Sequence, residues 1–177
     1  ATCDGFFYRK KTVAVVGGGD TACEEASYLS NLADKVYMIV RKDYLRASKV
    51  MQRRVMENQK IEIFFNTNTV GLFGDAKVEG AHLVRFKGTD REETFDIAID
   101  GFFLGIGHRP NTDIFANQIA LDEQGYIKTD GVTTATNIPG VFAAGDVADP
   151  RYRQAITSAG MGCKAALDAE RFLVEQE

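Results

Sequence analysis

The stretch KTVAVVGGGDTA, residues 11–22, constrains the fold more than any other part of the chain. Its first six residues are rich in β-branched side chains, which is typical of a buried strand. Three glycines follow at positions 17–19, and apolar residues then recur at helical spacing. A strand that passes through a glycine turn directly into a helix predicts a βαβ unit and therefore a parallel sheet.

Two further apolar segments extend this pattern. Residues 35–40 and 61–65 read as strands, and helices are expected over residues 20–33 and 48–58. The inner face of the second helix is expected to carry Val50, Met51 and Val55. Because strands that alternate with helices join through right-handed crossovers, these elements predict one parallel sheet.

The pattern changes near residue 69. Residues 69–100 contain strand-like segments separated by turn signals at Gly74 and Gly88, with no helical period. Such a segment predicts an antiparallel meander.

A glycine- and proline-containing loop within residues 100–111 is the best candidate for a domain boundary. We therefore expect one domain over residues 1–106 and another over residues 107–177. The second is expected to contain a short strand pair near residues 125–128, a buried strand over residues 140–146 and a helix over residues 153–175.

Residues 17–22, GGGDTA, fit the spacing G-x-G-x-x-A. In a strand–turn–helix unit the first glycine permits the turn, the second lets the backbone approach a pyrophosphate, and the small third residue allows close helix packing. The helix N-terminus adds free N–H groups and a partial positive charge. Gly17, Gly19 and Ala22 occupy these positions, which predicts a dinucleotide site. The alternative is a tight turn without a ligand.

The residues after the second expected strand indicate which dinucleotide binds. An NAD site usually has an acidic residue there, which accepts a hydrogen bond from the ribose 2′-hydroxyl. This chain has Arg41, Lys42 and Arg46 instead. Three cations at this position would attract a 2′-phosphate, so NADPH is the expected cofactor. The alternative is a solvated basic face of the next helix.

A second glycine-containing stretch, NIPGVFAAGDV, lies at residues 137–147. Its strand is expected to deliver Gly145 and Asp146 at the carboxyl end, where ligands of open sheets bind. Asp146 would accept hydrogen bonds from a polyol chain. Gln154 and Ala155 then open a helix whose positive N-terminus would face an electron-rich ring. The alternative is a tight strand end followed by a closely packed helix.

Composition narrows the class of protein. A net charge of −4 argues against a general nucleic-acid partner. No run approaches the roughly 18 apolar residues of a membrane helix. Cys3, Cys23 and Cys163 lack the spacing of a metal site or a disulfide framework. We expect a cytoplasmic protein that binds no metal, membrane or nucleic acid, with Cys23 buried as a small apolar residue.

Six stretches together resemble one known family: ATCDGFFYR, VVGGGDTA, RKDYLR, GIGHRPNT, PGVFAAGDV and YRQAITSAGMGCKAALDAERFL. From residue 1 to about residue 173 the chain is similar to low-molecular-weight bacterial thioredoxin reductase. The resemblance implies an α/β fold, with a Rossmann-like NADPH-binding domain of parallel sheet and antiparallel β-meander and the C-terminal strand–helix segment of an FAD-binding domain. It also implies NADPH and FAD as cofactors, thioredoxin as partner, and a homodimer.

The resemblance implies roles for individual residues. Cys3 matches the second cysteine of the family's C-A-T-C dithiol, the one that lies against the flavin. Asp4 matches the acid that carries a proton during dithiol–disulfide exchange. The residues that match the NADPH site are Gly17, Gly18, Gly19, Asp20, Thr21, Arg41, Lys42 and Arg46. Those that match the FAD site are Gly145, Asp146, Arg153, Gln154 and Ala155.

Three residues depart from the family's pattern at the NADPH site, and one of them is Val40, which stands where the family often has histidine. Lys42 stands where the family often has arginine. Since lysine offers a point charge rather than a bidentate fork, weaker selectivity for the 2′-phosphate is expected. Asp20 replaces a common asparagine, and its charge would oppose a pyrophosphate unless its side chain caps the helix.

The family's FAD-binding G-x-G-x-x-G loop and the first cysteine of its dithiol have no counterpart in these 177 residues. The chain is therefore expected to be a C-terminal fragment that binds NADPH without turning over thioredoxin by itself. Two alternatives stay open. One is an NADPH-dependent flavin reductase of another acceptor, such as a ferredoxin or peroxiredoxin partner, and the other is a nucleotide-binding module without catalysis.

Overall fold

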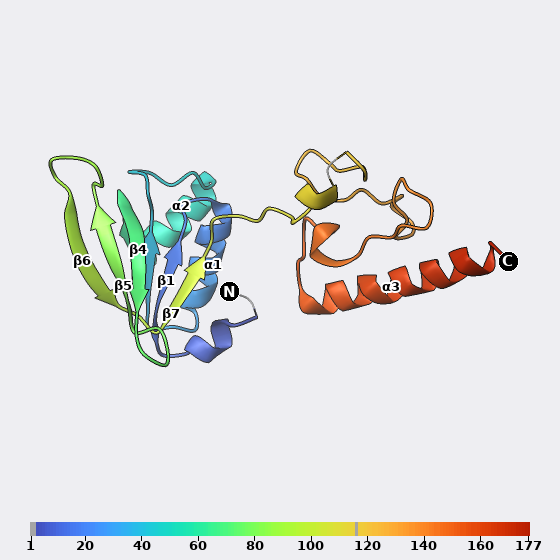
Figure 1. Ribbon diagram of the computed structural model, residues 1–177. Coiled ribbons are helices and arrows are strands. Elements are labelled where there is room, and N and C mark those ends of the chain that lie inside the picture. Colours follow the sequence, from blue (N-terminus) through green and yellow to red (C-terminus); the bar gives the residue numbers. More distant parts are fainter. Residues whose placement is uncertain (1–2, 116) are drawn as a thin grey trace. The chain divides into compact units, whose positions relative to one another are not determined.

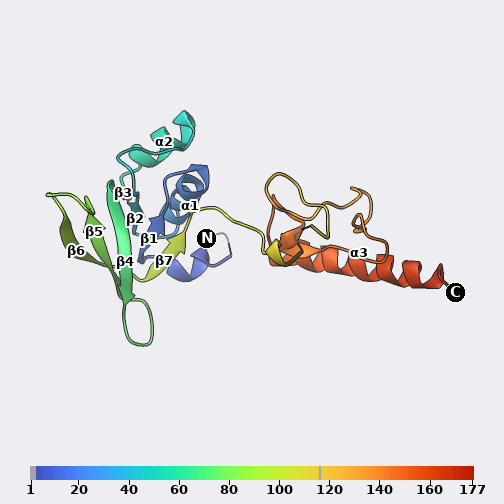
Figure 2. The same cartoon turned by 45° about the horizontal axis from the view of Figure 1, so that its top comes forward.

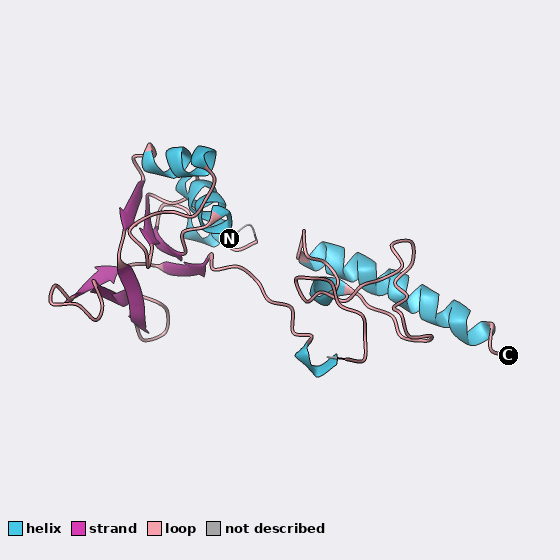
Figure 3. Cartoon of the chain, turned by 90° about the horizontal axis from the view of Figure 1, so that it is seen from above, coloured by secondary structure: helices cyan, strands magenta, loops and turns pink. Residues whose placement is uncertain are grey.

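The computed structural model describes residues 3–115 and 117–177, so Ala1 and Thr2 of the N-terminal stretch lie outside the described part. The chain forms two compact units, Ala1–Gly107 and His108–Glu177 (Figure 1). Every strand among the described residues belongs to the first unit (Figure 3).

A four-stranded parallel sheet organises the first unit. Its strands are β1 (Thr12–Val16), β2 (Lys35–Ile39), β3 (Ile61–Phe64) and β7 (Gly101–Leu104). They pair in the order β3-β2-β1-β7, and every pair is parallel. In sequence, α1 (Asp20–Ser30) lies between β1 and β2, and α2 (Lys49–Met56) lies between β2 and β3 (Figure 2). The predicted parallel sheet is confirmed.

Three antiparallel strands form a second sheet in the same unit. They are β4 (Thr67–Phe73), β5 (Gly80–Arg85) and β6 (Glu93–Ala98), paired in that order. The register shifts between Thr69 and Gly71, where β4 carries a bulge. The predicted meander is therefore confirmed.

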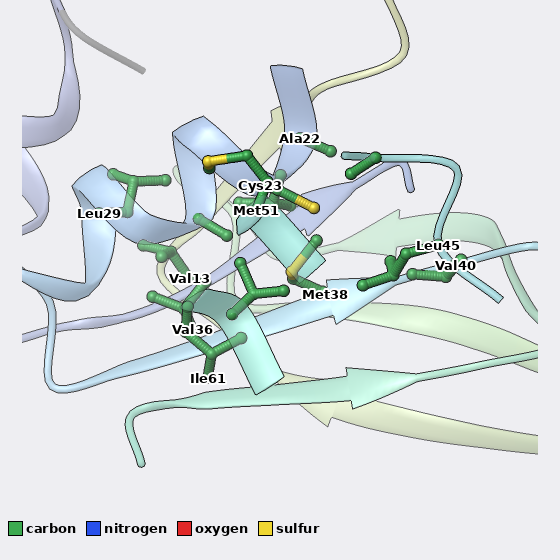
Figure 4. Close-up of a cluster of buried hydrophobic side chains, with 14 of the residues drawn as sticks. Val13, Ala22, Cys23, Leu29, Val36, Met38, Val40, Leu45, Met51 and Ile61 are labelled. Carbon is green, nitrogen blue, oxygen red and sulfur yellow. The ribbon is translucent and has the colours of Figure 1, made fainter. Parts of the chain in front are cut away.

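The two faces of the parallel sheet pack against different layers because side chains alternate along a strand. Val13 and Val36 lie in one core cluster with Leu29 of α1 and Met51 of α2 (Figure 4). Ala14 of β1 belongs to a second cluster, which the antiparallel sheet completes. The sheet thus lies between the helices and the meander.

The expectation that Val50 lies on the inner face of α2 is wrong. Val50 keeps 61% of its surface exposed, whereas Met51 and Val55 are buried. The helix begins at Lys49, and its inner face follows the four-residue spacing from Met51 to Val55. Val50 is consequently turned toward solvent.

A long helix, α3 (Ala155–Val174), dominates the second unit. Asp168 on this helix accepts hydrogen bonds from the Thr134 backbone N–H at 2.9 Å and from the Thr134 hydroxyl at 2.7 Å. These bonds tie the preceding loop to the helix. Short 3-10 turns cover Asp113–Phe115 and Gly145–Val147. Within the described part of the chain, no helix is both long enough and apolar enough to cross a membrane.

The expectation of a strand over residues 140–146 is wrong, because the structure describes all of these residues and has no strand there. A single bridge joins Ala135 to Phe142, and the expected short strand pair is likewise one bridge, between Leu121 and Ile127. A strand needs a neighbour along its length to pair its N–H and C=O groups. The described residues of this unit supply such a neighbour at isolated positions only, so the apolar run stays irregular.

Candidate dinucleotide-binding site

A pocket of about 700 Å³ opens at the carboxyl edge of the parallel sheet. It is lined by the turn after β1, the loop after β2, most of β4 and the end of β7. The predicted site residues that line it are Gly17, Gly18, Arg41, Lys42 and Arg46. The structure therefore brings the glycine turn and the basic cluster together in one cavity.

Gly17 and Gly19 serve different purposes in the turn. Gly17 has a φ of +138°, and a Cβ atom there would collide with the carbonyl oxygen of Gly105 and lie 2.8 Å from the Cβ of Ala22. A Cβ at Gly19, the N-cap of α1, would meet nothing within 4 Å. The fold thus requires Gly17, whereas Gly19 leaves open space beside the first N–H groups of α1. Those N–H groups have no partner within the helix and would attract an anionic group, although Gly19 itself does not line the pocket.

Backbone hydrogen bonds fix the basic loop, residues 41–47 after β2, to the glycine turn, residues 17–19 after β1. The N–H groups of Arg46 and Ala47 donate to the carbonyl oxygen of Gly18 at 2.6 and 3.2 Å. From α2, Gln52 Nε2 donates to the carbonyl oxygens of Leu45 at 3.1 Å and Ala47 at 2.7 Å. No sequence motif points to Gln52, because its role depends on where two loop carbonyls come to lie.

The three cations of the basic loop are available to a ligand. Arg41, Lys42 and Arg46 are exposed, and none forms an ion pair with a residue that the structure describes. The carbonyl oxygen of Lys42 accepts the N–H of Asn66 at 3.0 Å, which anchors this end of the loop. Cations without a carboxylate partner and the N-terminus of a helix both attract anionic groups.

Asp20 does not cap its own helix, contrary to one expectation. Gly19 is the N-cap of α1, and Asp20 Oδ1 accepts the backbone N–H of Ser48 at 2.9 Å. The N–H and hydroxyl of Ser48 hold the pKa of Asp20 below its usual range. The carboxylate therefore binds the start of α2. Thr21 follows in the first turn of α1, and neither Asp20 nor Thr21 lines the pocket.

The predicted redox residues lie away from the pocket. Cys3 and Asp4 are exposed and directly precede a 3-10 turn, Gly5–Tyr8. The ring of Tyr8 lies against Gly101, the first residue of β7, at the amino edge of the parallel sheet. The pocket opens at the carboxyl edge, and neither Cys3 nor Asp4 lines it.

The other two cysteines have contrasting surroundings. Cys23 is fully buried in the core cluster of α1 (Figure 4), which confirms the expectation for this residue. Burial, assisted by the charges of Asp20 and Glu24, raises the pKa of its thiol to about 11. A thiol that stays protonated is a poor nucleophile. Cys163 is exposed on α3.

Gly145 and Asp146 lie in a 3-10 turn instead of at the end of a strand. Gly145 has a φ of +77°, a conformation that suits glycine. Asp146 Oδ1 accepts a hydrogen bond from the hydroxyl of Ser158 on α3 at 3.0 Å. The turn is thereby held beside the first part of the helix.

The remaining predicted residues of the second unit gather at the start of α3. Gln154 is the N-cap and forms a capping box with Thr157, and Ala155 is the exposed first residue of the helix. Arg153 has a φ of +50°, and its guanidinium donates to the hydroxyl of Tyr126 at 3.3 Å. A guanidinium and a helix N-terminus are thus combined at one point of the unit.

Asp149 organises the loop before α3. One of its oxygens accepts the N–H groups of Arg151 and Tyr152 at 2.9 and 2.8 Å, and the other accepts that of Arg153 at 3.0 Å. Burial disfavours the charge, but the N–H groups of Tyr152, Arg153 and Arg151 and the hydroxyl of Thr157 outweigh it and hold the pKa of Asp149 below its usual range. An aspartate followed by proline is a turn signal that points to this residue in the sequence.

Replacing Asp149 by asparagine is expected to loosen this loop, since an amide supplies one acceptor oxygen where the carboxylate supplies two. Protection factors of the amides at residues 151–153 should fall by roughly tenfold, as expected for the loss of about one hydrogen bond. In the wild type, this protection should be complete above the ordinary carboxyl pKa of about 4 and should fall as the pH drops through the lowered pKa of Asp149. Hydrogen exchange followed by NMR measures both effects.

Asp113→Asn is the matched control for this experiment. Asp113 is exposed and pairs with the guanidinium of Arg109 at 2.7 Å, a surface pair of little weight. Equal loss of protection in the two variants would contradict the role assigned to Asp149.

Comparison with known proteins places the chain in a family. The family described as Pyridine nucleotide-disulphide oxidoreductase matches residues 1–162. A mitochondrial thioredoxin reductase of Kluyveromyces lactis is 55% identical over 179 residues, which cover 100% of this chain and 51% of the relative. A thioredoxin reductase of Coxiella burnetii is also 55% identical, with 98% of this chain and 56% of the relative covered.

Solved structures show the same likeness. Thioredoxin reductase from Streptococcus pyogenes matches with a TM-score of 0.87 and 35% identity, over 97% of this chain and 55% of that one. Thioredoxin reductase from Giardia duodenalis matches with a TM-score of 0.80 and 43% identity, over 98% of this chain and 56% of that one. These matches confirm the α/β fold class and the resemblance, and the chain spans about half the length of the curated relatives it matches. The chain belongs to the pyridine nucleotide-disulphide oxidoreductase family.

Proposed function

We propose that the protein containing this chain is an NADPH-dependent thioredoxin-disulfide reductase, which passes electrons from NADPH through FAD and a cysteine pair that includes Cys3 to thioredoxin. The observation that carries the proposal is the pocket where the glycine turn and the basic loop meet. The similarity of the chain, along its whole length, to proteins named thioredoxin reductase supports it.

On this proposal residues 1–106 form the NADPH-binding domain. The first N–H groups of α1 hold the pyrophosphate in the open space beside Gly19. Arg41, Lys42 and Arg46 hold the 2′-phosphate through charge-assisted hydrogen bonds, with Lys42 contributing a point charge. When bound, NADPH supplies a hydride and FAD accepts it. The protein's contribution is to orient both and to stabilise their charges.

Residues 107–177 then belong to the FAD-binding domain. The groups present fit such a ligand, because a carboxylate accepts hydrogen bonds from hydroxyls and cationic groups attract phosphates and electron-rich rings. Asp146 in the Gly145 turn would accept from the ribitol. Arg153, Gln154 and Ala155 at the start of α3 would contact the rest of the cofactor.

The dithiol chemistry is assigned to two exposed residues near the N-terminus, Cys3 and Asp4. The Cys3 thiolate exchanges with a disulfide, and Asp4 carries the proton that the exchange releases or consumes. Overall, NADPH and one proton reduce one thioredoxin disulfide to two thiols and leave NADP⁺. Thioredoxin as partner and a homodimer as the working assembly follow from the resemblance to thioredoxin reductases.

Replacing Arg46 by alanine tests the nucleotide part of this proposal. In the full-length protein, kcat/KM for NADPH in thioredoxin reduction should fall roughly 10- to 100-fold, because a charge-assisted hydrogen bond to the 2′-phosphate is removed. The value for NADH, which lacks that phosphate, should change by less than about twofold. Steady-state kinetics with both nucleotides measures the ratio.

Lys49→Ala is the control, because Lys49 is also an exposed cation but does not line the pocket. Equal losses with NADPH and NADH would show that Arg46 does not contact the 2′-phosphate. Reduction of a ferredoxin or peroxiredoxin partner in place of thioredoxin would favour a flavin reductase of another acceptor. Nucleotide binding without reduction of any acceptor would favour the module without catalysis.

A further inference from the structure

Tyr44 lies in the middle of the basic loop and lines the same pocket as Lys42 and Arg46. Its side chain keeps 54% of its surface exposed and makes no hydrogen bond or ring contact with a described residue. Its neighbour Leu45 is 4% exposed and belongs to the core cluster. Leu45 therefore anchors the loop by packing, whereas Tyr44 lines the pocket and keeps about half of its side chain exposed.

The backbone on both sides of Tyr44 is fixed. Before it, the carbonyl oxygen of Lys42 accepts the N–H of Asn66 at 3.0 Å, and after it, the N–H of Arg46 donates to Gly18 at 2.6 Å. An aromatic side chain on a fixed loop is a pre-organised contact surface, because little conformational freedom is lost when a ligand packs against it. Tyrosine has only two side-chain torsions, which keeps that loss small.

The chemistry of the neighbouring cations identifies the group that Tyr44 meets. On the proposed function, which this inference deepens, Lys42 and Arg46 bind the 2′-phosphate of NADPH. That phosphate is attached to the ribose that also carries adenine, so the adenine lies within one sugar of the loop. The nicotinamide lies beyond the pyrophosphate. We propose that Tyr44 is the stacking platform for the adenine ring and so contributes affinity at the nucleotide site.

The stacking assignment explains why an aromatic residue stands among the cations. Bases stack on aromatic faces without requiring a hydrogen-bond pattern, and the cations supply attraction for the phosphate alone. Tyr44 would then contribute to the binding of NADPH and NADH alike, whereas Arg46 distinguishes between them. The preference for NADPH over NADH therefore tests the role of Arg46, and the affinity for the adenine portion tests the role of Tyr44.

The experiment compares Tyr44→Leu with Tyr44→Phe in the full-length protein, with 2′,5′-ADP as the probe. This compound carries the adenine and the 2′-phosphate but no nicotinamide. Calorimetry should show about tenfold weaker binding for Tyr44→Leu and a change of less than about twofold for Tyr44→Phe, which keeps the ring. The ratio of kcat/KM for NADPH to that for NADH should stay as in the wild type in both variants.

NMR gives a signal that would not change if Tyr44 had only a structural role. The adenine H2 and H8 resonances of 2′,5′-ADP should shift upfield on binding to the wild type and to Tyr44→Phe, because the stacked ring shields them. The shift should be absent with Tyr44→Leu. Since the side chain is exposed, the unfolding temperatures of both variants should match that of the wild type, which checks that they fold.

Each result bears on one of the two claims. Unchanged affinity for 2′,5′-ADP in Tyr44→Leu, or a ring-current shift that persists there, overturns the stacking role and leaves the proposed function intact. A loss in Tyr44→Phe as large as in Tyr44→Leu also overturns it, because the hydroxyl would then carry the contact. A wild-type protein that does not prefer NADPH over NADH overturns the 2′-phosphate site itself.

Discussion

Replacing Gly17 by alanine is expected to destabilise the first unit by about 2–4 kcal/mol. The φ of +138° at Gly17 lies in a region that L side chains rarely adopt. The added methyl group would also collide with the carbonyl oxygen of Gly105 and the Cβ of Ala22, so that the segment after β7 and the first turn of α1 would have to move away from position 17. This is a large share of the roughly 5–15 kcal/mol that stabilises a typical domain. Urea unfolding followed by circular dichroism measures the loss.

Gly19→Ala is the matched control and separates folding from binding. Gly19 has a φ of −94°, and its Cβ would face open space. The free energy of unfolding should change by less than about 1 kcal/mol, while NADPH affinity should fall by roughly tenfold or more because the methyl group occupies the space assigned to the pyrophosphate. Wild-type stability in Gly17→Ala would contradict the packing argument. Wild-type NADPH affinity in Gly19→Ala would contradict the phosphate assignment.

Replacing Cys3 by serine in the full-length protein should lower NADPH-dependent thioredoxin reduction by about a thousandfold or more. Thiol–disulfide exchange requires a thiolate that attacks one sulfur and forms a mixed disulfide, and a hydroxyl can do neither. NADPH binding should be unchanged, because Cys3 does not line the pocket. A steady-state assay with thioredoxin as acceptor, combined with an NADPH titration of the same sample, measures both quantities.

Cys163→Ser is the control for this substitution. Cys163 is exposed like Cys3 but lies on α3, and its loss should leave the rate near that of the wild type. Retained activity in Cys3→Ser would show that another group carries the dithiol chemistry. An equal loss in Cys163→Ser would show that the effect is not specific to Cys3.

The elements of the first unit could be predicted because their determinants are local. Buried parallel strands are continuous apolar runs, and β1 and β2 show this directly. The turn after β1 needs a glycine at position 17 for a steric reason, so the sequence displays the constraint. The position of the cations after β2 likewise follows from the order of the elements. The confirmed parts of the fold and the pocket that gathers these residues rest on such local signals.

The contacts that join distant segments could not be predicted in the same way. The carboxylate of Asp20 binds the N–H of Ser48, and Gln52 binds two carbonyls of the basic loop, but neither pairing leaves a periodic pattern. The apolar run at residues 140–146 resembles a buried strand because burial and strand pairing produce the same composition. A partner strand beside residues 140–146 would have to come from another part of the fold, so these residues alone do not show whether one is present.

The opposite placement of Cys3 and the pocket has a consequence for redox control. Gly5 packs against Leu29 near the carboxyl end of α1, whereas the open space at Gly19 adjoins its first residue. The 11 residues of α1 measure about 16 Å, and the two residues from Gly5 back to Cys3 span at most about 7 Å. The 3-10 turn that Cys3 precedes and a group bound at Gly19 therefore lie near opposite ends of α1. On the proposed function FAD carries the electrons from the nucleotide to Cys3, so the oxidation state of Cys3 depends on nucleotide binding only through that carrier.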